Sequence, residues 1–167
     1  LPLGIFLFSA SVRNAQLMYN AGTQVAVTGG GIFYVGGAVE NAAGLFSNAG
    51  QTTMKGYFRN GADATGGFGA GKYFVYGDWE NNDVFTADQS DVVLTGNAQN
   101  ITGTSVTTFY DLTLQTGGTV KTQTLDANVS HLLELNDCEL ATTDYNMNVT
   151  NASPAAVTRQ NGYVSST

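Results

Sequence analysis

The single histidine of the chain, His131, is the natural starting point for catalysis, because imidazole can act as a general base near neutral pH. It lies within Val129-Ser130-His131-Leu132-Leu133, among apolar residues typical of a strand. A Ser-His-Asp arrangement needs three converging groups, and no nucleophile motif accompanies this histidine. The glycine-rich stretch 66–72 is followed by no helix signal, as a phosphate-binding loop would require. We therefore expect no catalytic residue and interpret 66–72 as a flexible turn.

Carboxylates gather in one part of the chain and could supply the oxygen ligands that Ca²⁺ prefers. They are Asp78, Glu80, Asp83, Asp88 and Asp91. Their spacing matches no EF-hand or nonapeptide calcium repeat, so solvated turn carboxylates are the interpretation we favour. If the chain binds a metal, we expect Ca²⁺ at these residues. We expect no organic cofactor.

The same acidic region raises an alternative from another class, a polysaccharide-active β-helix enzyme. Such an enzyme would need a catalytic Arg or Lys on the same face, and Lys72 and Lys121 are the only weak candidates. Cys138 is the only cysteine, so neither an intrachain disulfide nor a cysteine-based zinc site can form. We interpret it as a small buried hydrophobe.

Aromatic residues are densest between positions 57 and 79. We expect Phe58, Phe74 and Trp79 to point inward. Strand alternation must send others outward, where they suit stacking on a sugar or contact with another protein. Tyr57, Tyr73 and Tyr76 are the candidates.

A repeat of Gly-x-(apolar)-x-Asn predicts the elements that position these residues. Copies begin at Gly37, Gly56, Gly77 and Gly96, with steps of 19, 21 and 19 residues. Each copy follows a strand-like stretch and precedes a turn-rich one, and no helical periodicity is present. A fixed period near twenty is typical of stacked repeats. We predict an all-β fold, a parallel β-solenoid with rungs of about 19–21 residues, with a β-sandwich as the alternative.

Stacking brings equivalent residues of successive rungs about 4.8 Å apart. The repeat therefore predicts a ladder of Asn41, Asn60, Asn81 and Asn100, whose amides donate and accept along the stack. It likewise predicts an inward stack of Val39, Phe58, Trp79 and Ala98. From Thr108 onward the composition persists but the motif is lost, and the rung register cannot be placed.

Residues 1–16 form a separate segment that begins with the apolar run LPLGIFLF. It resembles the end of a signal peptide, and a structural N-terminal strand is the alternative. We expect residues 17–167 to form one β-solenoid domain that continues beyond Thr167 in the natural protein. The net charge of −7, with only six Lys and Arg, excludes a basic stripe for nucleic acid and disfavours anionic membranes.

Part of the second half resembles the β-rich repeat modules of large, adhesin-like secreted surface proteins of Bacteroidota-type bacteria. The resemblance rests on residues 99–103 (QNITG), 108–114 (TFYDLTL) and 156–164 (AVTRQNGYV). It covers less than half of the chain, and its motifs are structural. It implies an exported surface protein, of a group that commonly uses type IX secretion, with no active site to carry over.

These observations predict a secreted, non-enzymatic structural protein that assembles with itself or with other surface proteins. A solenoid exposes strand edges at its ends, and these can recruit further strands. Assembly into a filament or surface layer could use end-to-end contacts, or strand addition by Leu1–Phe8. A carbohydrate-binding adhesive module is the second hypothesis.

Overall fold

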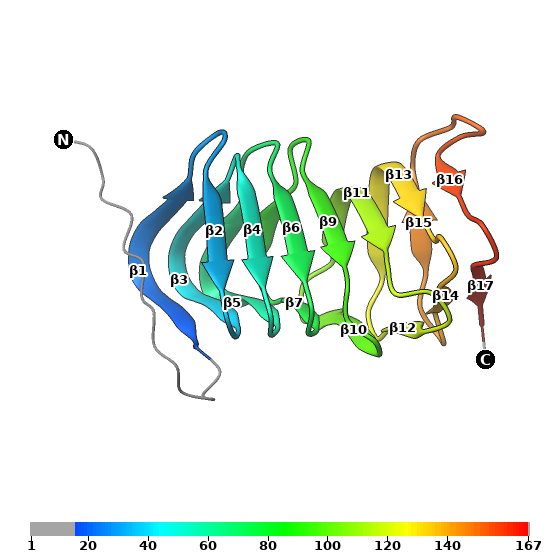
Figure 1. Cartoon of the computed structure of the whole chain (residues 1–167), viewed down its shortest axis with the longest axis horizontal. Coiled ribbons are helices and arrows are strands. Elements are labelled where there is room, and N and C mark those ends of the chain that lie inside the picture. Colours follow the sequence, from blue (N-terminus) through cyan, green and yellow to red (C-terminus); the bar gives the residue numbers. More distant parts are fainter. Residues whose placement is uncertain (1–15, 167) are drawn as a thin grey trace.

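The computed structural model describes residues 16–166. In that range the regular secondary structure consists of β-strands alone. The strands lie side by side along the long axis, with β1 at one end and β17 at the other (Figure 1). All strand pairs are parallel, and the chain winds through about seven turns. The predicted β-solenoid is therefore confirmed over the β-sandwich. The prediction for residues 1–16 falls, except for Gln16, outside the described residues.

Two parallel sheets form the walls of the solenoid. Along the first sheet the order is β1 (Met18–Val27), β3 (Val39–Asn48), β5 (Phe58–Gly67), β7 (Trp79–Asn81), β10 (Gln99–Gly103), β12 (Val120–Gln123), β14 (Glu139–Ala141) and β17 (Tyr163–Ser165), and β8 (Val84–Thr86) also pairs with β5. Along the second it is β2 (Ile32–Val35), β4 (Gln51–Met54), β6 (Lys72–Val75), β9 (Asp91–Leu94), β11 (Thr107–Leu114), β13 (Ala127–Glu134) and β15 (Met147–Val149), and β16 (Val157–Thr158) also pairs with β13.

The long strands β1 and β3 bend immediately after an asparagine. The pairing register shifts after Asn20 in β1 and after Asn41 in β3, so one strand contributes to two faces of the turn. At the bend, Asn20 Nδ2 donates to Asn41 Oδ1 at 2.7 Å. Asn41 Nδ2 donates to Asn60 Oδ1 at 3.1 Å, and Asn60 Nδ2 to Asn81 Oδ1 at 3.0 Å. The ladder of Asn41, Asn60 and Asn81 is confirmed and gains Asn20 as a member.

Asn100 does not belong to the ladder, and that part of the prediction was wrong. Gly103 is the strand partner of Asn81, whereas Asn100 is exposed and its backbone N–H donates to Asp78. The cause is a longer corner. Val75 and Trp79 are four residues apart, but their partners Leu94 and Ile101 are seven apart.

The predicted inward stack forms the centre of the core. Val39, Phe58 and Trp79 are direct partners in successive turns and are fully buried. The rings of Phe58 and Trp79 stack with centroids 4.5 Å apart. Ile101 is the next member of the stack, because it pairs with Trp79. The prediction of Ala98 was wrong, since the longer corner before β10 shifts this position as it shifts that of Asn100. Burial of each large side chain here contributes roughly 2 kcal/mol to stability.

The glycine of the motif lies where successive corners touch. Gly77 N–H donates to Gly56 O at 2.9 Å, and a Cβ on Gly77 would lie 2.6 Å from the backbone nitrogen of Tyr57. Close approach of the backbones, and not an unusual φ, therefore explains why the corner requires glycine.

Candidate functional site

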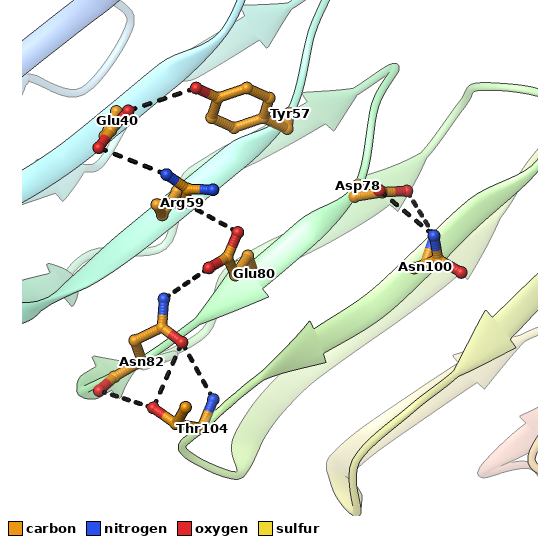
Figure 2. Close-up of polar contacts among 8 residues, drawn as sticks. All are labelled: Glu40, Tyr57, Arg59, Asp78, Glu80, Asn82, Asn100 and Thr104. Atoms are coloured by element: carbon orange, nitrogen blue, oxygen red, sulfur yellow. Dashed lines mark hydrogen bonds and ion pairs between the residues drawn. The ribbon is translucent and has the colours of Figure 1, made fainter.

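A row of charged and polar side chains crosses the outer face of the first sheet (Figure 2). Glu40, Arg59 and Glu80 are direct partners on β3, β5 and β7. Arg59 Nε lies 2.8 Å from Glu80 Oε2, and its Nη1 lies 3.6 Å from Glu40 Oε1. Tyr57 Oη donates to Glu40 at 3.3 Å, and Asn82 Nδ2 to Glu80 at 2.8 Å. Arg59 is therefore shared by two carboxylates, and the row keeps one net negative charge.

The electrostatics of this row follow from its pairing. The hydrogen bond to Glu80 raises the pKa of Arg59 above its usual value. Partial burial, followed by the Glu40 carboxylate, raises the pKa of Tyr57. Such partly exposed pairs contribute about 0–1 kcal/mol each. The row has the chemistry of a polar strand face and presents no isolated charge to a ligand.

The five carboxylates named as the ligands of a conditional Ca²⁺ site are not brought together by the fold. Within residues 16–166 no group of three or more His, Cys, Asp or Glu side chains could hold a metal ion. Asp78 immediately precedes β7, and Glu80 lies within it. Asp83 precedes β8, Asp88 lies between β8 and β9, and Asp91 begins β9. Four engage other partners: Glu80 binds Arg59 and Asn82, Asp78 the Asn100 N–H, Asp88 the Gly69 N–H, and Asp91 the Lys72 ammonium at 2.7 Å.

The structure separates the three tyrosines expected to make contacts. Tyr73 is fully buried, and its hydroxyl makes no hydrogen bond within the described residues. Burial raises its pKa well above the usual value. Phe74, expected inside, lies half-buried on the outer face. Tyr76 is 36% exposed, but Lys55 Nζ lies 3.3 Å from its ring centroid, and Tyr57 is half-buried in the polar row.

His131 lies on the outer face in a small polar and aromatic cluster. Its Nδ1 is 2.6 Å from Asp111 Oδ1, and its ring stacks on Tyr110 at 4.6 Å. The adjacent Ser130 hydroxyl donates to Phe109 O at 3.1 Å and not to the imidazole. The Asp–His pair can fix the orientation of the ring, but this serine does not complete a triad.

The burial of Lys121, which the sequence named only as a weak catalytic candidate, is a feature that sequence reasoning missed. Lys121 is fully buried, and its ammonium donates to Gly96 O, to Asn97 O at 2.9 Å and to Gln99 Oε1 at 3.0 Å. Burial lowers its pKa. These hydrogen bonds stabilise the long corner before β10, in the part of the stack that the asparagine ladder does not reach. Cys138 is a free, buried thiol, as interpreted from the sequence.

Exposed apolar side chains mark the first described turn. Leu17, Tyr19, Ile32 and Tyr34 are all more than half exposed. The outer edges of β1 and β2 have no strand partner among the described residues. No charged residue occurs from Gln16 to Ala38. This end of the solenoid is therefore an uncharged sheet edge with apolar side chains.

The opposite end has the same character and a hollow. Tyr145, Val157, Tyr163 and Val164 are exposed, and Arg159 is the only charged residue from 145 to 166. A hollow of about 360 Å³ opens between β15, β16 and β17. Its apolar lining residues are Leu133, Met147, Val149, Val157 and Val164. No motif in the sequence marked this surface, because it forms from the inward residues of the last turns.

Comparisons with known protein families, with curated proteins and with solved structures return no match. Among the described residues, no helix is long and apolar enough to cross a membrane. The class that can be stated is that of the fold, a parallel β-solenoid repeat protein.

Proposed function

We propose that this chain is an extracellular structural protein, without enzymatic activity, that assembles end to end into a filament or surface layer. One observation carries the proposal: exposed apolar side chains gather on the first and on the last turn of residues 16–166. Leu17, Tyr19, Ile32 and Tyr34 lie on the first described turn, and Tyr145, Val157, Tyr163 and Val164 on the last. Between them Phe68, Tyr76, Val84, Val106 and Val120 are scattered over several turns.

The scarcity of charge at the ends supports assembly through them. Free strand edges recruit other strands, and proteins that remain monomeric block them with Lys, Pro or charged side chains. Here the first described turn has no charge, and the last has only Arg159 and Pro154. Arg159 Nη1 donates to Gly162 O at 3.2 Å within its own turn. Within residues 16–166, the strand edges of the first and last turns therefore have little charge to oppose strand pairing.

The flanks favour solvent more than a partner. On the first sheet, Glu40, Arg59 and Glu80 satisfy one another. On the second, Lys72 pairs with Asp91. A partner would have to compete with these contacts. The low charged fraction of 11% and the resemblance to exported Bacteroidota-type modules support an extracellular setting.

Analytical ultracentrifugation with negative-stain imaging tests this function. We expect an average mass that rises with protein concentration, and particles that lengthen along one axis. A species that stays monomeric at high concentration, with no elongated particles, would refute the assembly role.

A carbohydrate-binding module remains the alternative, favoured by the polar row beside Tyr57. It has less support, because the Tyr76 ring already has Lys55 over it and the Tyr57 hydroxyl binds Glu40. Binding of a monomeric protein to a glycan array would favour it. A polysaccharide-active enzyme has less support still, since Lys121 is buried and Lys72 is paired with Asp91.

A further inference from the structure

The corner glycines of successive turns are joined by hydrogen bonds to their carbonyl groups, and the donor of these bonds changes in the middle of the solenoid. Gly77 N–H donates to Gly56 O at 2.9 Å, from backbone to backbone. Gly77 O instead accepts from the side-chain amide of Gln99. Gly96 O accepts from the ammonium group of Lys121. Two side chains therefore take over a contact that the backbone makes in the preceding turn.

The register of the strands explains this change of donor. Ile101 pairs with Trp79, so Gln99 follows Gly77 in the stack, two residues earlier. Lys121 is in turn the direct strand partner of Gln99. Both of these polar side chains are buried. Their strands, β10 and β12, have described partners on both sides, so the arrangement does not depend on where the described residues stop.

The Lys121 ammonium lies among three oxygens of the long corner before β10. It donates to Gly96 O, to Asn97 O at 2.9 Å and to Gln99 Oε1 at 3.0 Å. An ammonium group has three N–H donors, so donors and acceptors match in number. Gln99 Nε2 donates to Val75 O at 3.0 Å. The amide that supplies the third oxygen is therefore oriented by a contact that does not involve the lysine.

These three oxygens have the chemistry of a site for a monovalent cation. Carbonyl oxygens bind such ions by replacing their hydration shell. Among the described residues, no carboxylate forms an ion pair with Lys121. Burial lowers the pKa of this lysine, so the oxygens offset part of the desolvation of its charge and not all of it. The charge is therefore held by neutral oxygens alone.

We propose that the oxygens of Gly96, Asn97 and Gln99 form a binding site for an ammonium-type cation, which this chain fills with its own Lys121. The aliphatic part of the lysine then serves as a tether that keeps the cation in place. The site should accept a free ammonium ion once the tether is removed. This inference goes beyond the proposed function, because it concerns the folding of a single chain and not its assembly.

Chemical rescue of Lys121→Ala tests the site. This variant removes the donor from the three oxygens and opens space for a small cation. Urea unfolding of the full chain is measured near neutral pH in ammonium chloride and in tetramethylammonium chloride, at equal ionic strength. Ammonium should increase the ratio of folded to unfolded chain saturably, by about tenfold at about ten times its dissociation constant. Tetramethylammonium has no N–H donor and should produce no such increase.

Two control variants separate binding at the site from a general effect of salt. Lys72→Ala removes an exposed lysine that pairs with Asp91, and ammonium should not stabilise it saturably. Lys121→Met keeps an unbranched side chain in the space without a donor, and should likewise show no rescue. An equal response of Lys121→Ala and Lys72→Ala to ammonium would overturn the proposal. An equal response of Lys121→Ala to the two salts would overturn it as well.

Refolding provides the readout if Lys121→Ala does not fold in buffer alone. The variant is diluted from urea into each salt, and far-UV circular dichroism follows the recovery of strand structure. Recovery in ammonium and not in tetramethylammonium supports the site, whereas no recovery in either salt refutes it. All measurements are made below the assembly concentration, so a failed rescue would leave the proposed function intact. A protein that never assembles would refute that function without affecting this site.

Discussion

Replacing Asn60 with alanine removes an inner member of the asparagine ladder. Asn60 Oδ1 accepts from Asn41 Nδ2 at 3.1 Å, and its Nδ2 donates to Asn81 Oδ1 at 3.0 Å and to Val84 O at 2.9 Å. Asn41 Nδ2 would keep a bond to Thr65 O at 3.2 Å. Asn81 Oδ1 would lose its ladder donor inside a fully buried side chain.

The expected loss follows from these three bonds. Each contributes about 1 kcal/mol net, and a buried acceptor left without a donor costs about 1–3 kcal/mol. We therefore expect Asn60→Ala to lower the free energy of unfolding by about 4 to 6 kcal/mol. Asn60→Asp should cost more near neutral pH, because a buried carboxylate would face Asn81 Oδ1. That extra loss should shrink at low pH, where the protonated acid can donate.

Urea unfolding, monitored by far-UV circular dichroism and tryptophan fluorescence, measures this loss below the assembly concentration. Trp79 is the only tryptophan and lies two residues before Asn81, so its emission reports on this region. Asn100→Ala is the control, since Asn100 is exposed and its side chain makes one 3.3 Å bond to Asp78; we expect a change below about 0.5 kcal/mol. Equal losses for the two variants, or less than about 1 kcal/mol for Asn60→Ala, would refute the reasoning.

Three further substitutions probe the core and its corners. Tyr73→Phe should raise the free energy of unfolding by about 1 kcal/mol, because it removes a buried hydroxyl without a hydrogen bond. Burial holds the pKa of Tyr73 above its value in the unfolded chain, so the free energy of unfolding should fall as pH rises above about 10. Urea titrations across that range should show a smaller alkaline loss in Tyr73→Phe. Burial lowers the pKa of Lys121, so the free energy of unfolding should rise with pH between the folded-state pKa and about 10.4. Lys121→Met should lack that rise in the same urea titrations. An unchanged dependence of stability on pH in this variant would count against a buried ammonium. Gly103→Ala should destabilise the fold by more than about 2 kcal/mol, because Gly103 has φ +135° and an added Cβ would lie 1.9 Å from Asn81 O. Gly22→Ala is the control, at φ +111° with nothing within 4 Å, and should lose less stability in thermal unfolding. Equal losses in the two variants would show that φ alone matters.

The repeat in the sequence was sufficient to predict the solenoid, the ladder of Asn41, Asn60 and Asn81, and the stack of Val39, Phe58 and Trp79. These features share one cause. Parallel stacking places equivalent residues of successive turns side by side, so a side chain needed in every turn recurs at the period of the turn. Glycine at the corner follows the same rule, as the close approach at Gly77 shows.

Tertiary structure decided the features that depend on local length and strand parity. The long corner before β10 moved the ladder position from Asn100 to Gly103, and sequence spacing alone could not show where the extra residues would be accommodated. Tyr73 and Phe74 exchanged faces because a run of apolar residues contains no polar residue to reveal its parity, and a shift of one residue reverses both sides. The acidic residues were close in sequence, but the turn distributed them over different faces. The exposure of Val157 likewise depends on stacking, because it pairs with the buried Leu133 and no further described turn lies over it.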